Sequence, residues 1–134
     1  MVPPTDALGD TLSFGMDLNH LNLRVRDPVA CRDFYVRHFG FRPAFEAEGG
    51  YFVRNDQGFL LALVPAVAHQ PLPDGFHIGF GLADAEAVAS LHQELSTAAE
   101  PLTAVEDFRP RETYVTFRCW DPDGTEVEVF WEGP

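Results

Sequence analysis

The sequence predicts an α+β fold made of two βαβββ modules, and three observations support this prediction. First, the chain contains an internal repeat, in which a histidine opens a strand-like alternation at His20 and again at His77. Second, each of these strands is followed by a helix signal and then by three short strand patterns. Third, the chain of 134 residues, 46% of them hydrophobic, is long enough for one core and too short for two ordinary domains. The two modules are therefore expected to share one domain.

The first module is expected over residues 17–65. Apolar and polar residues alternate over 17–26, which is typical of a half-buried strand, and His20 lies on its polar face. Asp27 and Pro28 then favour a helix N-terminus, and Gly40 favours its end. Three strands are predicted after the helix, near residues 41–47, 51–55 and 59–64.

The second module is expected over residues 75–132, after a proline-rich connector. A strand is predicted over 76–82, and Asp84 is the expected N-cap of the helix that follows. Three further strands are predicted near residues 102–106, 113–120 and 126–132. Residues 1–16 are expected to form a flexible leader, and residues 17–134 a single domain.

Strand alternation predicts which side chains lie on the sheet face opposite the helices. On the last strand, Val127 and Val129 are expected to face the core, so Glu128 faces the other way. The same argument applied to the other strands adds these side chains to that face: His20, His77, Tyr114, Thr116 and Arg118. His20, His77 and Glu128 are therefore expected on one sheet face.

Two histidines and one glutamate occupy matching positions of the repeat. Aligning the turn residues Gly58 and Gly124 places Ala62 opposite Glu128, so only three of the four equivalent positions carry a ligand. His20, His77 and Glu128 together form a facial set of two imidazoles and one carboxylate, which leaves coordination positions open. A single histidine on a strand is more often a surface or core residue, and no role is expected for the other three, His38, His69 and His92.

Composition excludes several function classes. The net charge is −12 with only nine Lys and Arg residues, so binding to the phosphates of nucleic acid is not expected. The sequence has no basic N-terminal region and no apolar run near the ~20 residues of a membrane span. Cys31 and Cys119 are expected to be free buried thiols, and the protein to be cytoplasmic.

Two motifs carry a resemblance to a known family. They are HLNLRV, beginning at His20, and DPDGTEVE, which begins at Asp121 and ends at Glu128. With the aromatic helix end around Phe39, they resemble the vicinal oxygen chelate superfamily, which includes glyoxalase I, extradiol dioxygenases, fosfomycin-resistance enzymes and bleomycin-resistance proteins. The resemblance implies a glyoxalase-like fold, a cupped mixed sheet around one divalent metal ion, with His20, His77 and Glu128 as its ligands. It also implies a homodimer, in which the cup is often completed across the interface.

Departures from the subfamilies leave the reaction open. Glyoxalase I has four protein ligands, and the fourth would fall at Ala62, which cannot bind metal. Extradiol dioxygenases have a tyrosine where this chain has Arg118. Fosfomycin-resistance enzymes need a basic and hydroxyl cluster that partly follows the last strand, where this chain ends at Pro134. Bleomycin-resistance proteins lack the metal ligands.

Further residues are candidates for the same site. Tyr114 is a candidate catalytic proton donor, although a tyrosine on a sheet also serves packing. Arg118 is a candidate partner of a substrate anion, or a solvated strand residue. Three more substrate-binding candidates are Asn22, Phe52 and Phe130; the two aromatic residues equally suit a dimer seam.

Two functions therefore follow from the sequence. The first is a divalent-metal-dependent enzyme, using Fe, Mn, Ni or Zn, that acts on a small oxygen-bearing organic substrate in a dioxygenase-, lyase- or isomerase-like reaction. The alternative is a metal-free protein that sequesters an antibiotic or metabolite. A homodimer is expected in either case, because two modules alone leave sheet edges exposed.

Overall fold

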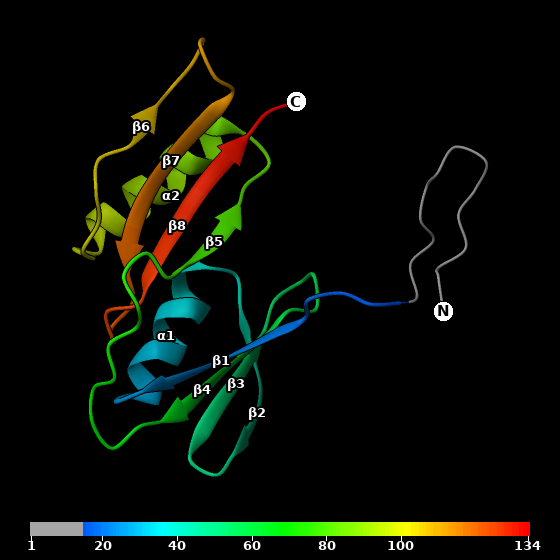
Figure 1. The fold of residues 1–134 in the computed structure, drawn as a ribbon, viewed down its shortest axis with the longest axis vertical. Helices are drawn as coiled ribbons and strands as arrows, with labels where there is room; N and C mark the ends of the chain where they lie inside the picture. Colours follow the sequence, from blue (N-terminus) through cyan, green and yellow to red (C-terminus); the bar gives the residue numbers. More distant parts are fainter. Residues whose placement is uncertain (1–14) are drawn as a thin grey trace.

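The computed structural model describes residues 15–134 and shows the predicted element order twice (Figure 1). The first module contains β1 (His20–Val25), α1 (Pro28–His38), β2 (Arg42–Ala47), β3 (Gly50–Arg54) and β4 (Leu60–Pro65). The second contains β5 (His77–Gly81), α2 (Ala85–Thr97), β6 (Glu106–Asp107), β7 (Tyr114–Trp120) and β8 (Glu126–Glu132). The leader expected over residues 1–16 lies outside the described residues, apart from Gly15 and Met16.

Each module forms its own four-stranded mixed sheet. The strand orders are β1-β4-β3-β2 and β5-β8-β7-β6, so the two sheets have the same topology. In each sheet the first strand pairs in parallel with the last and is itself an edge strand. The α+β prediction of two βαβββ modules is confirmed. Within one chain, however, β1 and β5 are not hydrogen-bonded to each other, so the two sheets are separate.

The helix starts are those that the sequence predicts. The Asp27 carboxylate accepts a hydrogen bond from the Ala30 amide at 3.0 Å, and Asp84 accepts one from the Ala87 amide at 2.7 Å. Each aspartate thus satisfies an amide that the first helical turn leaves without a partner. Gly40, just after α1, has a φ of +72°, which an L side chain rarely adopts, and the chain turns there toward β2.

The strand predicted near residues 102–106 is wrong in its extent. Only an isolated bridge forms, between Leu102 and Cys119, and β6 itself is restricted to Glu106 and Asp107. The reason lies at Thr103, whose side-chain hydroxyl, rather than a backbone carbonyl, accepts the hydrogen bond of the Arg118 amide at 2.9 Å. A side chain has replaced a backbone acceptor, and regular pairing stops there.

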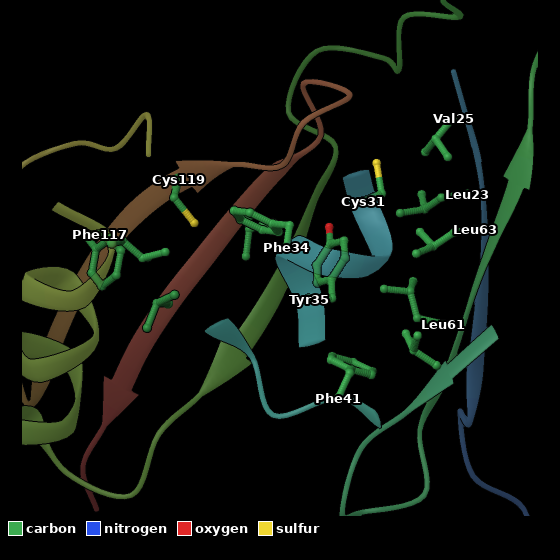
Figure 2. Packing of buried hydrophobic residues seen from close by; sticks show 14 of the residues in the cluster. Leu23, Val25, Cys31, Phe34, Tyr35, Phe41, Leu61, Leu63, Phe117 and Cys119 are labelled. Carbon is green, nitrogen blue, oxygen red and sulfur yellow. The ribbon is translucent and has the colours of Figure 1, made fainter. Parts of the chain in front are cut away.

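A single hydrophobic core joins the two modules (Figure 2). Phe34 and Tyr35 of α1 belong to the same buried cluster as Leu61 of the first sheet and Phe117 of the second. The ring of Phe80, on β5, lies 4.8 Å from that of Phe39, at the end of α1. Because the helix-covered faces of both sheets meet in this core, each sheet turns its other face outward.

The terminal motif of the second module also links the modules. Tyr35 of α1 donates a hydrogen bond from its hydroxyl to the buried Asp121 carboxylate at 2.8 Å. The other oxygen of Asp121 accepts from the amides of Asp123 and Thr125 at 2.9 Å each. Burial raises the pKa of Asp121, although these hydrogen bonds oppose the rise. The Asp121 carboxylate therefore shapes the β7–β8 turn and attaches it to α1.

We expect Tyr35→Phe to lower the free energy of unfolding by about 1–3 kcal/mol, because it leaves one oxygen of a buried carboxylate without a donor. Urea denaturation of the two proteins measures this difference. Tyr51→Phe, on β3, is the matched control and should stay within about 0.5 kcal/mol of the wild type. Equal stability of Tyr35→Phe and the control would show that the modules are not joined through this bond.

Two of the histidines without an expected role prove to be packed structural residues. His38 is buried and contacts Glu94 of α2, with 2.8 Å between its Nδ1 atom and the carboxylate, so it also joins the modules. His92 contacts the Thr103 carbonyl through Nε2 at 2.8 Å and packs its ring against Phe117. These contacts give both histidines a packing role and indicate no metal-binding role for either.

The cysteines are free and buried, as the sequence predicts. Burial raises the pKa of both Cys31 and Cys119 to about 12, so both stay protonated at neutral pH. Among residues 15–134, no helix is long and apolar enough to cross a membrane.

Candidate functional site

The second module brings His77 and Glu128 together on its outward face. His77 opens the edge strand β5, and Glu128 lies on β8 next to it, opposite Gly79 in the parallel register. The Nε2 atom of His77 is 3.5 Å from Oε1 of Glu128. The glutamate side chain is 12% exposed and the imidazole 37%, so the pair lies in a shallow, open part of the sheet.

Two hydroxyl groups hold the other oxygen of Glu128. Tyr114 and Thr116, both on β7, donate hydrogen bonds to Oε2, the threonine at 2.7 Å. Burial alone would raise the pKa of Glu128, but the two hydroxyls, together with Arg118 and His77, outweigh it and lower the pKa. The carboxylate is therefore anionic at neutral pH, which is the form that binds metal ions.

Tyr114 is correspondingly a hydrogen-bond donor. Burial and the hydrogen bond to Glu128 raise the pKa of its phenol, so the hydroxyl keeps its proton at neutral pH. That proton is directed at Glu128. The catalytic role that the sequence suggests for Tyr114 remains a prediction.

Both candidate imidazoles have one nitrogen occupied by a neighbour. Nδ1 of His77 lies 2.9 Å from the Gly75 carbonyl, which can only accept, so this nitrogen carries the proton. Nδ1 of His20 lies 2.8 Å from the side-chain oxygen of Asn19. In the neutral form of each imidazole, Nε2 is then the nitrogen whose lone pair can bind a metal ion. Orientation of a ligand histidine by such a second hydrogen bond is usual at metal sites.

The distance between the two donor atoms of the second module fits a shared ion. If His77 Nε2 and Glu128 Oε1 each lay ~2.1 Å from a metal ion, their separation of 3.5 Å would correspond to an angle of about 110° at the metal. That angle lies within the range of tetrahedral and distorted five- or six-coordinate sites. The residues present thus fit a divalent ion at this position.

The first module carries the remaining candidates on its own outward face. His20 and Asn22 lie on β1, and Asn22 is opposite Ala62 in the register, the position equivalent to Glu128 in the second sheet. Phe52, on β3, is also opposite Ala62 and stacks on the exposed Phe45, with 4.4 Å between ring centroids. This face therefore has one imidazole beside an apolar and aromatic wall.

The structure does not bring the three predicted ligands together in one chain. Among residues 15–134 there is no group of three or more His, Cys, Asp or Glu side chains arranged to hold a metal ion. His20 belongs to one sheet, and His77 and Glu128 belong to the other. Strand parity predicts one shared sheet face for all three ligands, whereas the two sheets share a core and turn their other faces outward separately.

Two further candidates line the second half of the site. Arg118 lies opposite Glu128 in the register, but its Nε atom pairs with Glu126 at 2.9 Å. The ring of Phe130 covers Gly79 and Gly81, where an added Cβ would come within 3.4 and 3.3 Å of it. The absence of side chains at these glycines thus lets the Phe130 ring lie over β5, the strand that His77 opens.

Sequence reasoning missed the partners that orient the candidate ligands. Strand alternation places Thr116 on the correct face but does not indicate its role, and no sequence pattern indicates Asn19 or Gly75. No sequence signal identifies a carbonyl such as that of Gly75 as a histidine partner, because the contact depends on the local path of the connector.

A separate cavity of about 620 Å³ lies between β1, the connector and the β7–β8 turn. Its walls include Asn22, Arg24, His69 and Trp120, but not His20, His77 or Glu128. The candidate ligands therefore do not lie in this cavity, and Asn22 alone is common to the cavity wall and the predicted site.

Comparisons with known proteins agree with the fold. A family model described as Glyoxalase/Bleomycin resistance protein/Dioxygenase superfamily matches residues 17–129. A solved structure of a possible glyoxalase from Bacillus cereus is 30% identical, with a TM-score of 0.72 over 86% of this chain and 98% of that one. No curated protein matches the chain.

Two more distant structures share the fold. Lactoylglutathione lyase from Agrobacterium tumefaciens is 21% identical, with a TM-score of 0.70 over 89% of this chain and 96% of that one. A mutant of the fosfomycin resistance protein FosX from Listeria monocytogenes, complexed with Mn(II) and 1S,2S-dihydroxypropylphosphonic acid, is 16% identical. Its TM-score is 0.74 over 87% of this chain and 92% of that one.

Proposed function

Because the chain belongs to the Glyoxalase/Bleomycin resistance protein/Dioxygenase superfamily, we propose that it is a divalent-metal-dependent enzyme acting on a small organic substrate with two neighbouring oxygen atoms. One observation carries the proposal. His77 Nε2 and Glu128 Oε1 lie 3.5 Å apart, while the other nitrogen of His77 and the other oxygen of Glu128 are engaged in hydrogen bonds. The two atoms that are left to bind a metal ion are therefore the two that lie close together.

The third ligand, His20, comes from a second copy of the chain in this proposal. β1 and β5 are both edge strands, and their outward faces carry His20 and His77. If β1 of one chain lay beside β5 of its partner, His20 of one copy would face His77 and Glu128 of the other. Two-fold symmetry would then create two equivalent sites and would cover four sheet edges at once.

A bound divalent ion would supply a Lewis acid that polarises substrate oxygens. The chain's own residues would shape the space around it. Phe130, which covers Gly79 and Gly81, would form an apolar wall of the site, and Phe52 and Asn22 of the partner chain would line the opposite wall. Arg118 would have to break its ion pair with Glu126 to bind a substrate anion. This lining suits a small, largely apolar molecule with one polar, oxygen-bearing end.

The metal belongs to the set Fe, Mn, Ni or Zn, because two imidazoles and one carboxylate suit all four. The FosX complex contains Mn(II), which makes manganese the first ion to test. The reaction is of the dioxygenase, lyase or isomerase kind. The free, buried cysteines fit the cytoplasmic location expected from the sequence.

Metal analysis tests the proposal directly. We expect the purified protein, supplemented with Mn(II) or Ni(II) and then desalted, to retain about one ion per chain and to sediment as a dimer at micromolar concentration. Failure of the wild type to retain any of the four metals would contradict the enzyme proposal and favour a metal-free protein that sequesters an antibiotic or metabolite. Metal binding by a monomer would contradict the shared site.

A further inference from the structure

The two oxygens of Glu128 have different surroundings. Oε2 accepts hydrogen bonds from the hydroxyls of Tyr114 and Thr116, which use both of its in-plane lone pairs. Oε1 instead faces His77 Nε2 at 3.5 Å. A carboxylate on a flexible glutamate side chain would otherwise exchange its oxygens freely by rotation about the last bond.

Strand register explains why both hydroxyls reach the same oxygen. Tyr114 and Thr116 are two residues apart on β7 and so lie on one face, whereas the residue directly opposite Glu128 is Arg118. The glutamate side chain therefore leans along the sheet toward Thr116, its diagonal neighbour, and Tyr114, two residues further along β7. Arg118 stays with Glu126, so no guanidinium competes with the hydroxyls for Oε2.

The two hydroxyl groups differ in burial and in the other acceptors that lie near them. Thr116 is 3% exposed, and its hydroxyl oxygen lies 2.7 Å from Glu128 Oε2 and 3.2 Å from the Val129 carbonyl. A threonine hydroxyl has one proton, and the shorter contact to a charged acceptor is the stronger hydrogen bond. Tyr114 is only half-buried. The carboxylate is thus held by one buried hydroxyl, that of Thr116, and by one half-buried hydroxyl, that of Tyr114.

We propose that Tyr114 and Thr116 are positioning residues that make Glu128 a one-oxygen ligand, presenting Oε1 to the metal and withholding Oε2. This inference rests on the proposed metal site. A glutamate that binds through one oxygen occupies one coordination position instead of two. With three protein donors, such an arrangement leaves up to three positions of a six-coordinate ion for a chelating substrate.

Mn(II) titration of purified variants tests the inference, with free Mn(II) measured by electron paramagnetic resonance. We expect Thr116→Val and Tyr114→Phe each to raise the Mn(II) dissociation constant about tenfold, the effect typical of losing a partner of a metal ligand. Thr116→Ser, which keeps the hydroxyl, should bind as the wild type does. Tyr51→Phe, on the other sheet, is the matched control for tyrosine and should also be unchanged.

A second measurement reports on the way the carboxylate binds. Infrared difference spectra of metal-loaded against metal-free protein show a wider separation of the two carboxylate stretching bands for one-oxygen ligation than for two-oxygen ligation. We expect wide separation in the wild type and narrower separation in the double variant Tyr114→Phe/Thr116→Val, whose Glu128 is free to turn. A merely structural role of the two residues would not change this band separation.

The outcomes separate this inference from the proposed function. Wild-type affinity in both single variants, combined with loss of Mn(II) in Glu128→Gln, would overturn the positioning role and leave the metal site standing. Equal loss in Thr116→Ser and Thr116→Val would also overturn it, because packing rather than the hydroxyl would then be responsible. A wild type that binds neither Mn(II) nor Fe, Ni or Zn would overturn both. Because Tyr114 is half-buried, Tyr114→Phe remains informative if Thr116→Val fails to fold.

Discussion

Glu128→Gln should lower the affinity for a divalent ion by more than ~100-fold, the largest effect that we expect of any single substitution. The change removes the only anionic ligand of the proposed set, a loss greater than the 10- to 100-fold cost of disturbing a ligand's partner. The new amide has only one oxygen, so if that oxygen accepts from Tyr114 and Thr116, the amide nitrogen takes the place of Oε1 and cannot bind the metal ion. Metal retained after desalting, and Mn(II) titration, measure the effect.

Glu132→Gln is the matched control for this change. Glu132 lies on the same strand and the same face as Glu128, but it is exposed. It should retain metal as the wild type does. Unfolding of both variants in the presence of a chelator separates loss of metal binding from loss of fold. Full metal occupancy in Glu128→Gln would show that Glu128 is not a metal ligand and would contradict the enzyme proposal.

Mixing two variants that each lack a different metal ligand should restore metal binding if the site is shared between chains. His20→Ala and Glu128→Ala each lack one ligand, and each alone should bind metal poorly. In a mixed dimer, one of the two sites receives His20 from the Glu128→Ala chain and Glu128 from the His20→Ala chain, so it is intact. Random exchange of subunits makes about half of the dimers mixed, so about a quarter of the wild-type sites should return.

A site built within one chain predicts the opposite result. Each chain of the mixture would then contain one defective site, and mixing would restore nothing. The control is the mixture of His77→Ala with Glu128→Ala. Both of these ligands come from the same module, so their mixture should stay inactive in either arrangement. Metal content after joint refolding measures both mixtures.

Local patterns were enough to predict the elements and their faces. The caps at Asp27 and Asp84 depend on residues three positions apart, so the sequence contains all of the information. Strand parity correctly placed Glu128 beside His77 and on the side of Tyr114, because alternation in a strand is independent of the rest of the fold. The strand predicted over 102–106 was wrong in its extent, because strand alternation does not reveal that the Thr103 side chain accepts the hydrogen bond of the Arg118 amide.

What the sequence by itself determined is therefore which side chains face away from the helices: His20 in one module, and His77 and Glu128 in the other. Only the tertiary structure decided where those two faces point. The two modules share one core, and the α1 end of the first contacts the second through Phe39 with Phe80 and Tyr35 with Asp121. Packing between residues far apart in the chain sets that arrangement, and no periodicity encodes it. It turns the two halves of the proposed site outward, and in our proposal a second chain joins them.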